Sequence, residues 1–151
     1  MSSDAQSVPV VTVRNAGSGD AAAIARLSGE LGYPASAADI ERRLRAIAAD
    51  SAAVLVAESP VVGVVGWVHV RMLPLLTRDL GAEIGGLVVD VARRGGGIGR
   101  QLLTAAEAWA RERKAASLRL RSNVVRDGAH AFYRRCGFAA SKASLLFTKT
   151  L

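Results

Sequence analysis

The stretch RRGGGIGRQLLTAAEAWARERK, residues 93–114, places four glycines within five residues at the entrance to an amphipathic run. Apolar residues recur in this run at helical spacing, and one face carries Ile98, Leu102, Ala105, Ala106 and Trp109. This spacing predicts a helix that begins near Gly97. The first turn of a helix presents unpaired N–H groups and the positive end of the helix dipole, which attract phosphate, and glycines leave those groups accessible. The chain is therefore expected to build an anion-binding loop at the start of a helix.

Two common glycine-rich phosphate loops do not fit this spacing. The P-loop requires a lysine followed by serine or threonine after its last glycine, and no such pair follows here. The dinucleotide fingerprint G-x-G-x-x-G fails in both available registers, because neither ends on glycine. The pattern that fits is Arg-x-x-Gly-x-Gly, formed by Arg94, Gly97 and Gly99, directly after an apolar segment typical of a strand.

Alternating and helical hydrophobic patterns divide the chain into short elements. Strands are expected at 9–16, 52–59, 61–72, 82–90 and 117–123, with one or two more between Phe138 and Leu151. Besides the helix near Gly97, helices are expected at 20–31, 36–47 and 127–137, with Asp20, Ser36 and Asp127 as N-caps and Gly137 at the last end. Residues 73–81 are expected to form a loop. This order predicts a mixed sheet flanked by helices.

The length and composition favour one globular domain. With 151 residues the chain can bury a core without disulfides, so we expect a single domain over 9–151 after a short disordered tail at 1–8. The single cysteine, Cys136, excludes an internal disulfide and a multi-cysteine metal site. No apolar run approaches the ~20 residues of a membrane span, and no signal-peptide pattern is present. A cytoplasmic protein is expected.

The net charge of +7 is carried mainly by arginine, with 17 arginines and 3 lysines. The arginines are spread along the chain, and aromatic residues make up only 5% of it, so few stacking partners lie between them. This distribution argues against a nucleic-acid surface and favours an anionic small molecule, which needs only a few of these charges. We expect neither nucleic acid nor a membrane as a partner.

The pattern of Arg94, Gly97 and Gly99 resembles the acyl-CoA-binding motif of the GNAT superfamily of N-acetyltransferases. A second motif of that family follows in the expected order, in the segment SNVVRDGAHAFYRRCGF. The matching positions are Asn123, Ala129, Phe132, Tyr133, Gly137 and Phe138. The similarity covers roughly residues 82–139, and two motifs in the right order are far more specific than one glycine loop.

The resemblance implies the GNAT fold, an α/β (α+β) architecture with a mixed, mostly antiparallel sheet of six to seven strands flanked by about four helices. In that fold the strands at 82–90 and 117–123 start paired and then splay apart around acyl-CoA, which leaves backbone groups without partners. Acetyl-CoA is the implied co-substrate, with its pantetheine arm on the open strand edge and its pyrophosphate on the glycine loop. The implied binding residues are Leu87, Val88, Val89, Arg94, Gly95, Gly96, Gly97, Ile98, Gly99, Arg100, Asn123, Ala129, Phe132 and Tyr133. Gly85 and Gly86, inside a strand, favour a bulge or a close ligand approach.

Acetyl transfer to an amine requires a proton acceptor. An alkylammonium group has a pKa near ~10.4 and is almost fully protonated at pH 7. The candidate base is Glu83, which shares a strand face with Gly85 and Leu87 by period-two counting. His69, His130 or a chain of water molecules could serve instead.

The resemblance also implies the remaining catalytic groups. The backbone N–H of Val88 would stabilise the oxyanion, and Tyr133 would protonate the departing thiolate. Direct transfer in a ternary complex is expected, because no histidine or acid is placed to activate Cys136 for an acetyl-cysteine intermediate. Two histidines without an acidic partner at ligand spacing predict no metal site.

The motifs and the terminal LFTKTL are similar to the small-amine branch of the family, such as aminoalkylphosphonate and aminoglycoside 6′-type acetyltransferases. The chain departs from the phosphonate enzymes at Gly86, where they tend to carry glutamate. The expected acceptor is a primary amine of a small molecule, and the net basic segment 69–81 favours one that bears an acidic group. Alternatives are acetylation of protein α-amines and a non-catalytic acyl-CoA sensor. A homodimer could pair through an edge strand at 144–150.

Overall fold

The structure is a computed structural model, and it describes residues 10–122 and 127–151. The chain divides into two compact units, Met1–Leu120 and Arg121–Leu151. The first unit contains, in chain order, β1 (Thr12–Asn15), the 3₁₀ turn η1 (Ser18–Asp20), α1 (Ala21–Glu30), α2 (Ala37–Ala46), β2 (Ala52–Ser59), β3 (Gly63–Leu75), β4 (Arg78–Val89), the 3₁₀ turn η2 (Val91–Arg93), α3 (Ile98–Glu112) and β5 (Leu118–Leu120). The second unit contains α4 (Asp127–Arg135).

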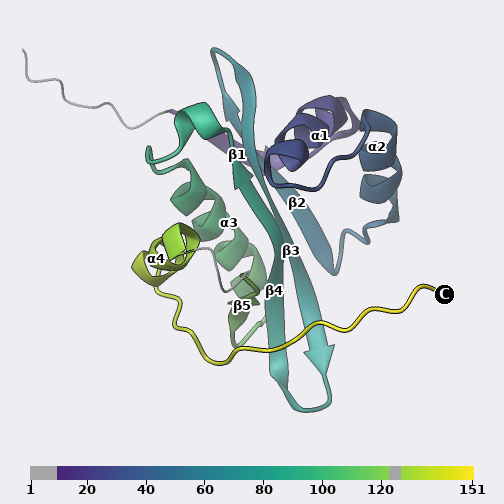
Figure 1. The fold of residues 1–151 in the computed structure, drawn as a ribbon, viewed down its shortest axis with the longest axis vertical. Helices are drawn as coiled ribbons and strands as arrows, with labels where there is room; N and C mark the ends of the chain where they lie inside the picture. Colours follow the sequence, from purple (N-terminus) through teal and green to yellow (C-terminus); the bar gives the residue numbers. More distant parts are fainter. Residues whose placement is uncertain (1–9, 123–126) are drawn as a thin grey trace, which may run out of the picture. The chain divides into compact units, whose positions relative to one another are not determined.

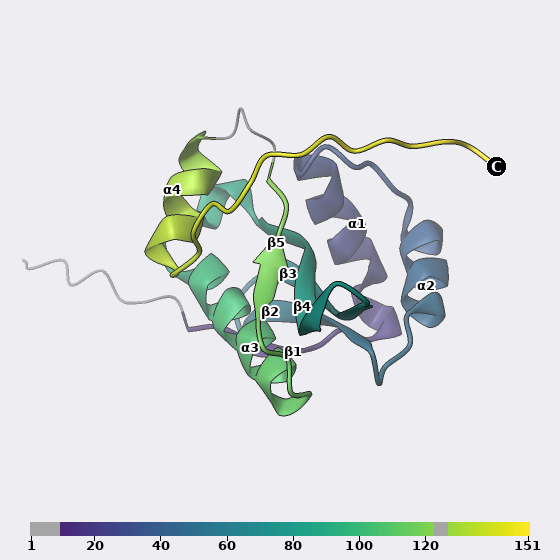
Figure 2. The ribbon, with the colours of Figure 1, turned by 90° about the horizontal axis from the view of Figure 1, so that it is seen from below.

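The strands of the first unit form one sheet in the order β1-β2-β3-β4-β5. Neighbouring strands are antiparallel except for β4 and β5, which are parallel. The helices α1 and α2 lie on one face of this sheet and α3 lies on the other (Figure 1, Figure 2). The predicted mixed, mostly antiparallel sheet flanked by helices is therefore confirmed, with five strands among the described residues in place of six to seven.

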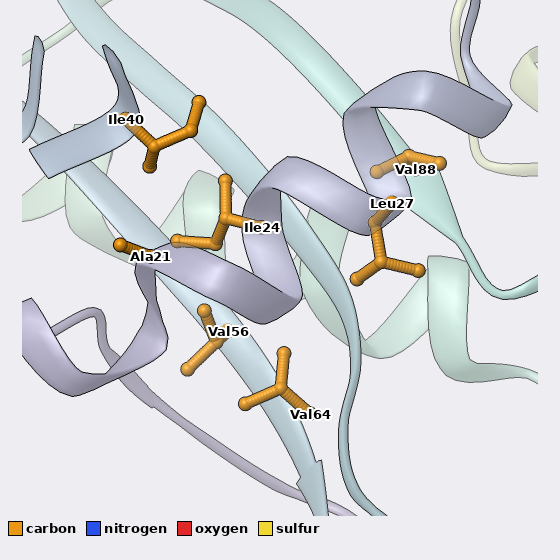
Figure 3. Packing of buried hydrophobic residues seen from close by; sticks show 7 residues of the cluster. All are labelled: Ala21, Ile24, Leu27, Ile40, Val56, Val64 and Val88. Atoms are coloured by element: carbon orange, nitrogen blue, oxygen red, sulfur yellow. The ribbon is translucent and has the colours of Figure 1, made fainter. Parts of the chain in front are cut away.

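Buried aliphatic side chains join α1 to one face of the sheet (Figure 3). They come from α1, α2 and three strands, and are Ala21, Ile24, Leu27, Ile40, Val56, Val64 and Val88. The three-residue spacing of Ile24 and Leu27 directs both side chains of α1 toward the sheet. Because Val88 belongs to this cluster, its side chain marks the α1 face of β4.

The helix α3 packs through an apolar stripe of its own. Its buried residues are Ile98, Leu102, Leu103, Ala106 and Ala110. Of the residues predicted for this face, Ile98, Leu102 and Ala106 are buried, while Ala105 and Trp109 are half-buried. Leu103 and Ala110 are buried as well, so the apolar stripe is wider than predicted. Because Ile98 is buried, the first residue of α3 is packed into the core directly after the glycine loop.

Local signals at the helix ends behave mostly as predicted. Ser36 Oγ accepts a hydrogen bond from the Asp39 N–H, and Asp39 Oδ2 accepts one from the Ser36 N–H, both at 3.1 Å, which forms a capping box. Gly137 follows α4 with a φ of +92°, the left-handed conformation common after a helix. Asp20 is different, because its buried carboxylate pairs with Arg14 at 2.8 Å and makes no side-chain cap to α1.

The segment 73–81 was expected to be a loop, and this prediction is wrong. It forms the end of the long β3–β4 hairpin, in which only two residues separate the strands. Pro74 interrupts the register, which resumes where Leu75 pairs with Arg78. A proline is tolerated at such an irregularity, where its missing N–H breaks no regular ladder bond.

The strands expected between Phe138 and Leu151 are also absent. Residues 139–151 are exposed and form neither helix nor strand. An alternating pattern becomes a strand only where a second strand supplies hydrogen bonds, and no described residue pairs with this segment. The expected edge strand at 144–150 is thus missing, and the homodimer stays a prediction.

Candidate functional site

The strand β4 loses its β5 partner partway along its length. The parallel pairs run from Ala82 with Leu118 to Ile84 with Leu120, and no pair follows. Residues 85–89 continue as strand, and residues 86–89 pair only with β3. Within the unit that ends at Leu120, the second edge of residues 85–89 is therefore open, as the predicted splaying requires.

A β-bulge lies at the point where this pairing ends. His69 pairs with Gly86 and Val70 pairs with Ile84, so Gly85 is an extra residue on β4. A bulge bends its strand and disrupts the local ladder. Of the two expectations for the glycine pair, the bulge is present. It also breaks the period-two alternation, so the expectation that Glu83 and Leu87 share a strand face is wrong: Glu83 lies opposite Arg71 and Leu87 opposite Val68, on the other face.

The alternation of the ladder determines which backbone groups face the open edge. The Asp90 N–H donates to a β3 carbonyl at 2.8 Å, so every second residue before it, including Val88, also faces β3. Leu87 and Val89 face the opposite edge. There the Val89 carbonyl accepts a hydrogen bond from Arg94 Nε at 3.1 Å. The open edge therefore presents the backbone groups of Leu87 and Val89.

The glycine loop enters α3 through two left-handed residues. Gly95 and Gly97 have φ values of +85° and +92°, a conformation that favours glycine. Gly97 immediately precedes α3, and no side chain caps the start of the helix. The N–H groups of Ile98 and Gly99 in the first turn therefore have no intrahelical acceptor. The predicted residues 94–100 all lie in this segment, and its backbone fits an anion such as pyrophosphate.

Two side chains of β3 lie against the glycine pair of β4. A Cβ at Gly86 would be 2.7 Å from Trp67 Cη2, and a Cβ at Gly85 would be 2.9 Å from His69 Nδ1, both closer than side chains tolerate. The alternative expectation was a close ligand approach, but the space beside these glycines is taken by the protein's own indole and imidazole. Trp67 packs against the α1 cluster, so His69, two residues further on, faces the same side of the sheet.

His69 is half-buried beside the bulge. Burial, and then the positive charge of Arg71, lower the pKa of the imidazole below its ordinary value of 6.5. The side chain is therefore neutral at pH 7, and a neutral imidazole can accept a proton.

Glu83 is buried, and both of its carboxylate oxygens are bonded to arginines. Arg71 Nη2 donates to Oε1 at 2.8 Å, and Arg119 Nε donates to Oε2 at 2.9 Å. Burial by itself would raise the pKa of the carboxyl, but the two guanidinium hydrogen bonds outweigh it and the pKa is lowered. A carboxylate held in this way is a weak proton acceptor. The arrangement therefore favours a structural role for Glu83, as a clamp that joins β3, β4 and β5 through its two ion pairs, over the role of catalytic base predicted from the sequence.

Replacing Glu83 with glutamine is expected to lower the free energy of unfolding at pH 7 by about 1–2 kcal/mol, because two arginines lose a charged partner. The pKa of Glu83 is lower in the folded chain than its unfolded value of about 4.5. The stabilisation of the fold by the Glu83 carboxylate is therefore fully present above pH 4.5 and is lost as the pH falls below that value. The difference between wild type and Glu83→Gln should therefore shrink from pH 7 to pH 3.5. Urea unfolding at both pH values measures it, and an unchanged difference would contradict the clamp.

The helix α4 carries the predicted proton donor in an aromatic cluster. Tyr133 is half-buried, and its ring centroid lies 5.4 Å from that of Phe132 and 6.0 Å from that of Phe138. Ala129 lies one helical turn before Tyr133, on the same face of α4. Tyr133 therefore packs against two aromatic rings within its unit.

Some expectations fall outside what the structure describes, namely those on the tail at residues 1–8, on Asn123 and on the side chain of Asp127. Across residues 10–122 and 127–151, no group of three or more histidine, cysteine, aspartate and glutamate side chains could hold a metal ion. None of the helices in these ranges has the length and apolar character needed to cross a membrane.

Comparison with known proteins places these features in a family context. The family described as the acetyltransferase (GNAT) family matches residues 23–138. The aminoglycoside N(6′)-acetyltransferase type 1 of Stenotrophomonas maltophilia is 31% identical over 144 residues, which cover 93% of this chain and 94% of that protein.

Solved structures share the fold. A transcriptional regulator from Bacillus halodurans C-125 is 29% identical with a TM-score of 0.82, over 93% of this chain and 100% of that chain. The aminoglycoside antibiotic 6′-N-acetyltransferase AAC(6′)-Ih from Acinetobacter baumannii is 14% identical with a TM-score of 0.80, over 94% of this chain and 99% of that chain. The second likeness concerns the fold alone.

Proposed function

This chain belongs to the GNAT family of acetyltransferases and is an N-acetyltransferase, and we propose that it transfers the acetyl group of acetyl-CoA directly to the primary amine of a small molecule. The observation that carries the proposal is the open edge of β4 at residues 85–89, followed closely by an uncapped helix start. The pantetheine arm of acetyl-CoA has two amides that can pair with a strand edge, and its pyrophosphate is an anion for the helix start.

The binding residues follow from this arrangement. The Leu87 carbonyl and the Val89 N–H receive the pantetheine amides, and the N–H groups within residues 95–100 receive the pyrophosphate. Arg94 donates to the Val89 carbonyl through Nε, so its two Nη groups remain for a phosphate oxygen. The resemblance also assigns Asn123, Ala129, Phe132 and Tyr133 to acyl-CoA binding, and we propose this role for them.

The oxyanion of the tetrahedral intermediate needs an N–H donor that is not already used in the sheet. Val88 was the predicted donor, but its N–H belongs to the set that faces β3. The N–H of Leu87 faces the open edge, one residue earlier. We therefore assign this role to Leu87, with Val88 packing into the core beneath it.

His69 is proposed to accept the proton of the attacking amine. Its imidazole lies at the bulge, where β4 opens, and is neutral at pH 7. Glu83, the first candidate, has both oxygens engaged by arginines, so it is proposed to position the strands around the site. In this mechanism the amine nitrogen forms a bond to the acetyl carbonyl carbon while its proton passes to His69.

The collapse of the intermediate breaks the bond between carbon and sulfur. The departing thiolate needs a proton, and Tyr133 is proposed to give it from its phenol group. The aromatic contacts of Tyr133 support this role, because packing against Phe132 and Phe138 restricts the movement of its ring within its unit.

A thermal-shift experiment with acetyl-CoA, CoA, NAD and ATP side by side tests the co-substrate. We expect stabilisation by acetyl-CoA and CoA only, followed by thiol release with an amine panel that includes aminoglycosides, acidic amines and peptides. Arg94→Gln should raise the Kd for acetyl-CoA about threefold to fivefold, as expected for an exposed charge. The control Arg93→Gln changes the neighbouring arginine and should leave the Kd unchanged. Absence of a shift with both CoA species would overturn the proposal.

A further inference from the structure

The cluster around Glu83 carries more positive charge than its structural role needs. Two guanidinium groups, from Arg71 and Arg119, converge on a single carboxylate. The side chains of Arg71 and Arg119 are 47% and 32% exposed, whereas that of Glu83 is 10% exposed. Solvent and ligands therefore meet the two cations, and the only anion of the cluster lies beneath them.

Both arginines have N–H donors that are not used in their hydrogen bonds to Glu83. A guanidinium has five N–H donors in a planar fork. Arg71 reaches Glu83 through one Nη group, and Arg119 reaches it through Nε. These are the only hydrogen bonds that the described part of the chain gives to these two side chains. The remaining donors match the geometry of a carboxylate or phosphate, which arginine binds with two parallel hydrogen bonds.

The cluster lies next to the site where the acceptor amine would react. Arg71 is two residues beyond His69 on the same face of β3, a step of about 7 Å along a strand. Glu83 likewise precedes the bulge residue Gly85 by two positions on β4. A small acceptor whose amine is at His69 can therefore extend an acidic group to the arginines.

The distribution of carboxylates gives no matching site for a polycation. Most acidic side chains that the structure describes already pair with arginines: Asp20, Glu30, Asp39, Glu58, Glu83, Asp90, Glu107 and Glu112. Within those ranges, the carboxylates without an ion pair are Glu41, Asp50 and Asp79, which lie on α2, in the turn before β2 and on β4. Among the side chains that the structure describes, a cationic acceptor would thus meet two exposed arginines and no cluster of unpaired acids.

We propose that Arg71 and Arg119 form a subsite for an acidic group, a carboxylate or phosphate, carried by the acceptor amine. The inference rests on the proposed function, since it names the acceptor class of that same site. Glu83 holds the two guanidinium groups in place and limits their net charge to a single positive unit.

Matched acceptors that differ in the acidic group test the subsite. The pairs are 2-aminoethyl phosphate with ethanolamine, and β-alanine with its methyl ester, with kanamycin as the polycation. We expect the acidic member of each pair to have a kcat/KM about tenfold or more above its partner, mainly through KM, as charged hydrogen bonds provide. In Arg71→Gln and Arg119→Gln this ratio should fall close to one. Arg78→Gln, an exposed arginine at the start of β4, is the control and should keep the ratio.

A second measurement does not depend on turnover. Calorimetric titration of the CoA-saturated protein with 2-aminoethyl phosphate should give a Kd about tenfold or more higher in Arg119→Gln. In Glu83→Gln the same Kd should be about threefold lower, because a neighbouring negative charge is gone. Opposite shifts for two partners of one ion pair are not produced by a loss of structure, which would weaken binding in both variants.

The outcomes separate the two proposals. If no amine is acetylated but the Kd values shift as described, the proposed function fails and the anion subsite is retained. If amines are acetylated but each pair reacts equally, or kanamycin is preferred, the subsite is overturned and the proposed function is retained. Equal Kd values in Arg119→Gln and wild type would also overturn the subsite.

Discussion

Replacing Tyr133 with phenylalanine is expected to lower kcat about a hundredfold, while the Kd for acetyl-CoA changes by less than about twofold. General acid catalysis contributes about 10²–10⁴-fold, and the lower end applies here because a thiolate, with a pKa near ~8.5, is already a fair leaving group. The substitution removes one oxygen and keeps the ring that packs on Phe132 and Phe138. Stability should therefore change little, so the loss of rate reports chemistry.

The chain offers a matched control for this substitution. Its other tyrosine, Tyr33, is 71% exposed between α1 and α2, and Tyr33→Phe removes the same oxygen. Steady-state thiol release measures kcat for both variants, and an acetyl-CoA titration measures Kd. We expect the Tyr33→Phe rate to stay within about twofold of wild type, as for a surface group outside the reaction. Wild-type kcat in Tyr133→Phe would remove Tyr133 from the mechanism.

Replacing His69 with glutamine is expected to lower kcat/KM about a hundredfold and to change its dependence on pH. A protonated imidazole cannot accept the proton of the amine, so wild-type activity should rise as the pH increases through the pKa of His69. That pKa lies below 6.5 because of burial and the charge of Arg71. In His69→Gln this acidic limb should disappear, which a purely structural role of His69 would not cause.

Two further variants identify the titrating group. His130→Gln replaces the other histidine, on α4, and should retain the acidic limb of the profile. Glu83→Gln should also retain it, because the pKa of Glu83 lies below its usual range and its titration falls at lower pH. Loss of the limb in Glu83→Gln, with His69→Gln unaffected, would return the role of base to Glu83.

The features that short sequence patterns determine were predictable. The glycine loop, the start of α3, the capping box at Ser36 and the helix end at Gly137 each depend on a few consecutive residues. Their conformations follow from backbone freedom and local hydrogen bonds, so no knowledge of distant partners is needed. The bulge at the glycine pair of β4 belongs to the same group.

The features that depend on pairing between distant strands were not predictable. Glu83 could be singled out as a titratable residue, but the register that aligns it with Arg71 and Arg119 depends on three strands and their connections. The direction of the Val88 N–H depends on the same ladder. The expected strands after Phe138 were wrong for a related reason, since alternation shows which residues suit a strand but supplies no partner.

The close approach of β3 side chains to the glycine pair of β4 predicts that the residues at these positions co-vary among homologous chains. A Cβ at Gly86 would meet the indole of Trp67 at 2.7 Å, and one at Gly85 would meet the imidazole of His69 at 2.9 Å. A substitution that enlarges residue 86 therefore requires a smaller residue at 67, and one that enlarges residue 85 requires a smaller residue at 69. Without the second substitution the sheet face is overpacked, which is destabilising. Among homologous chains, side-chain volumes at 67 and 86, and at 69 and 85, should vary inversely. Lineages that abandon the histidine would then be free to fill the bulge, and a bulky residue at 85 would mark enzymes that take the proton of their amine by another route.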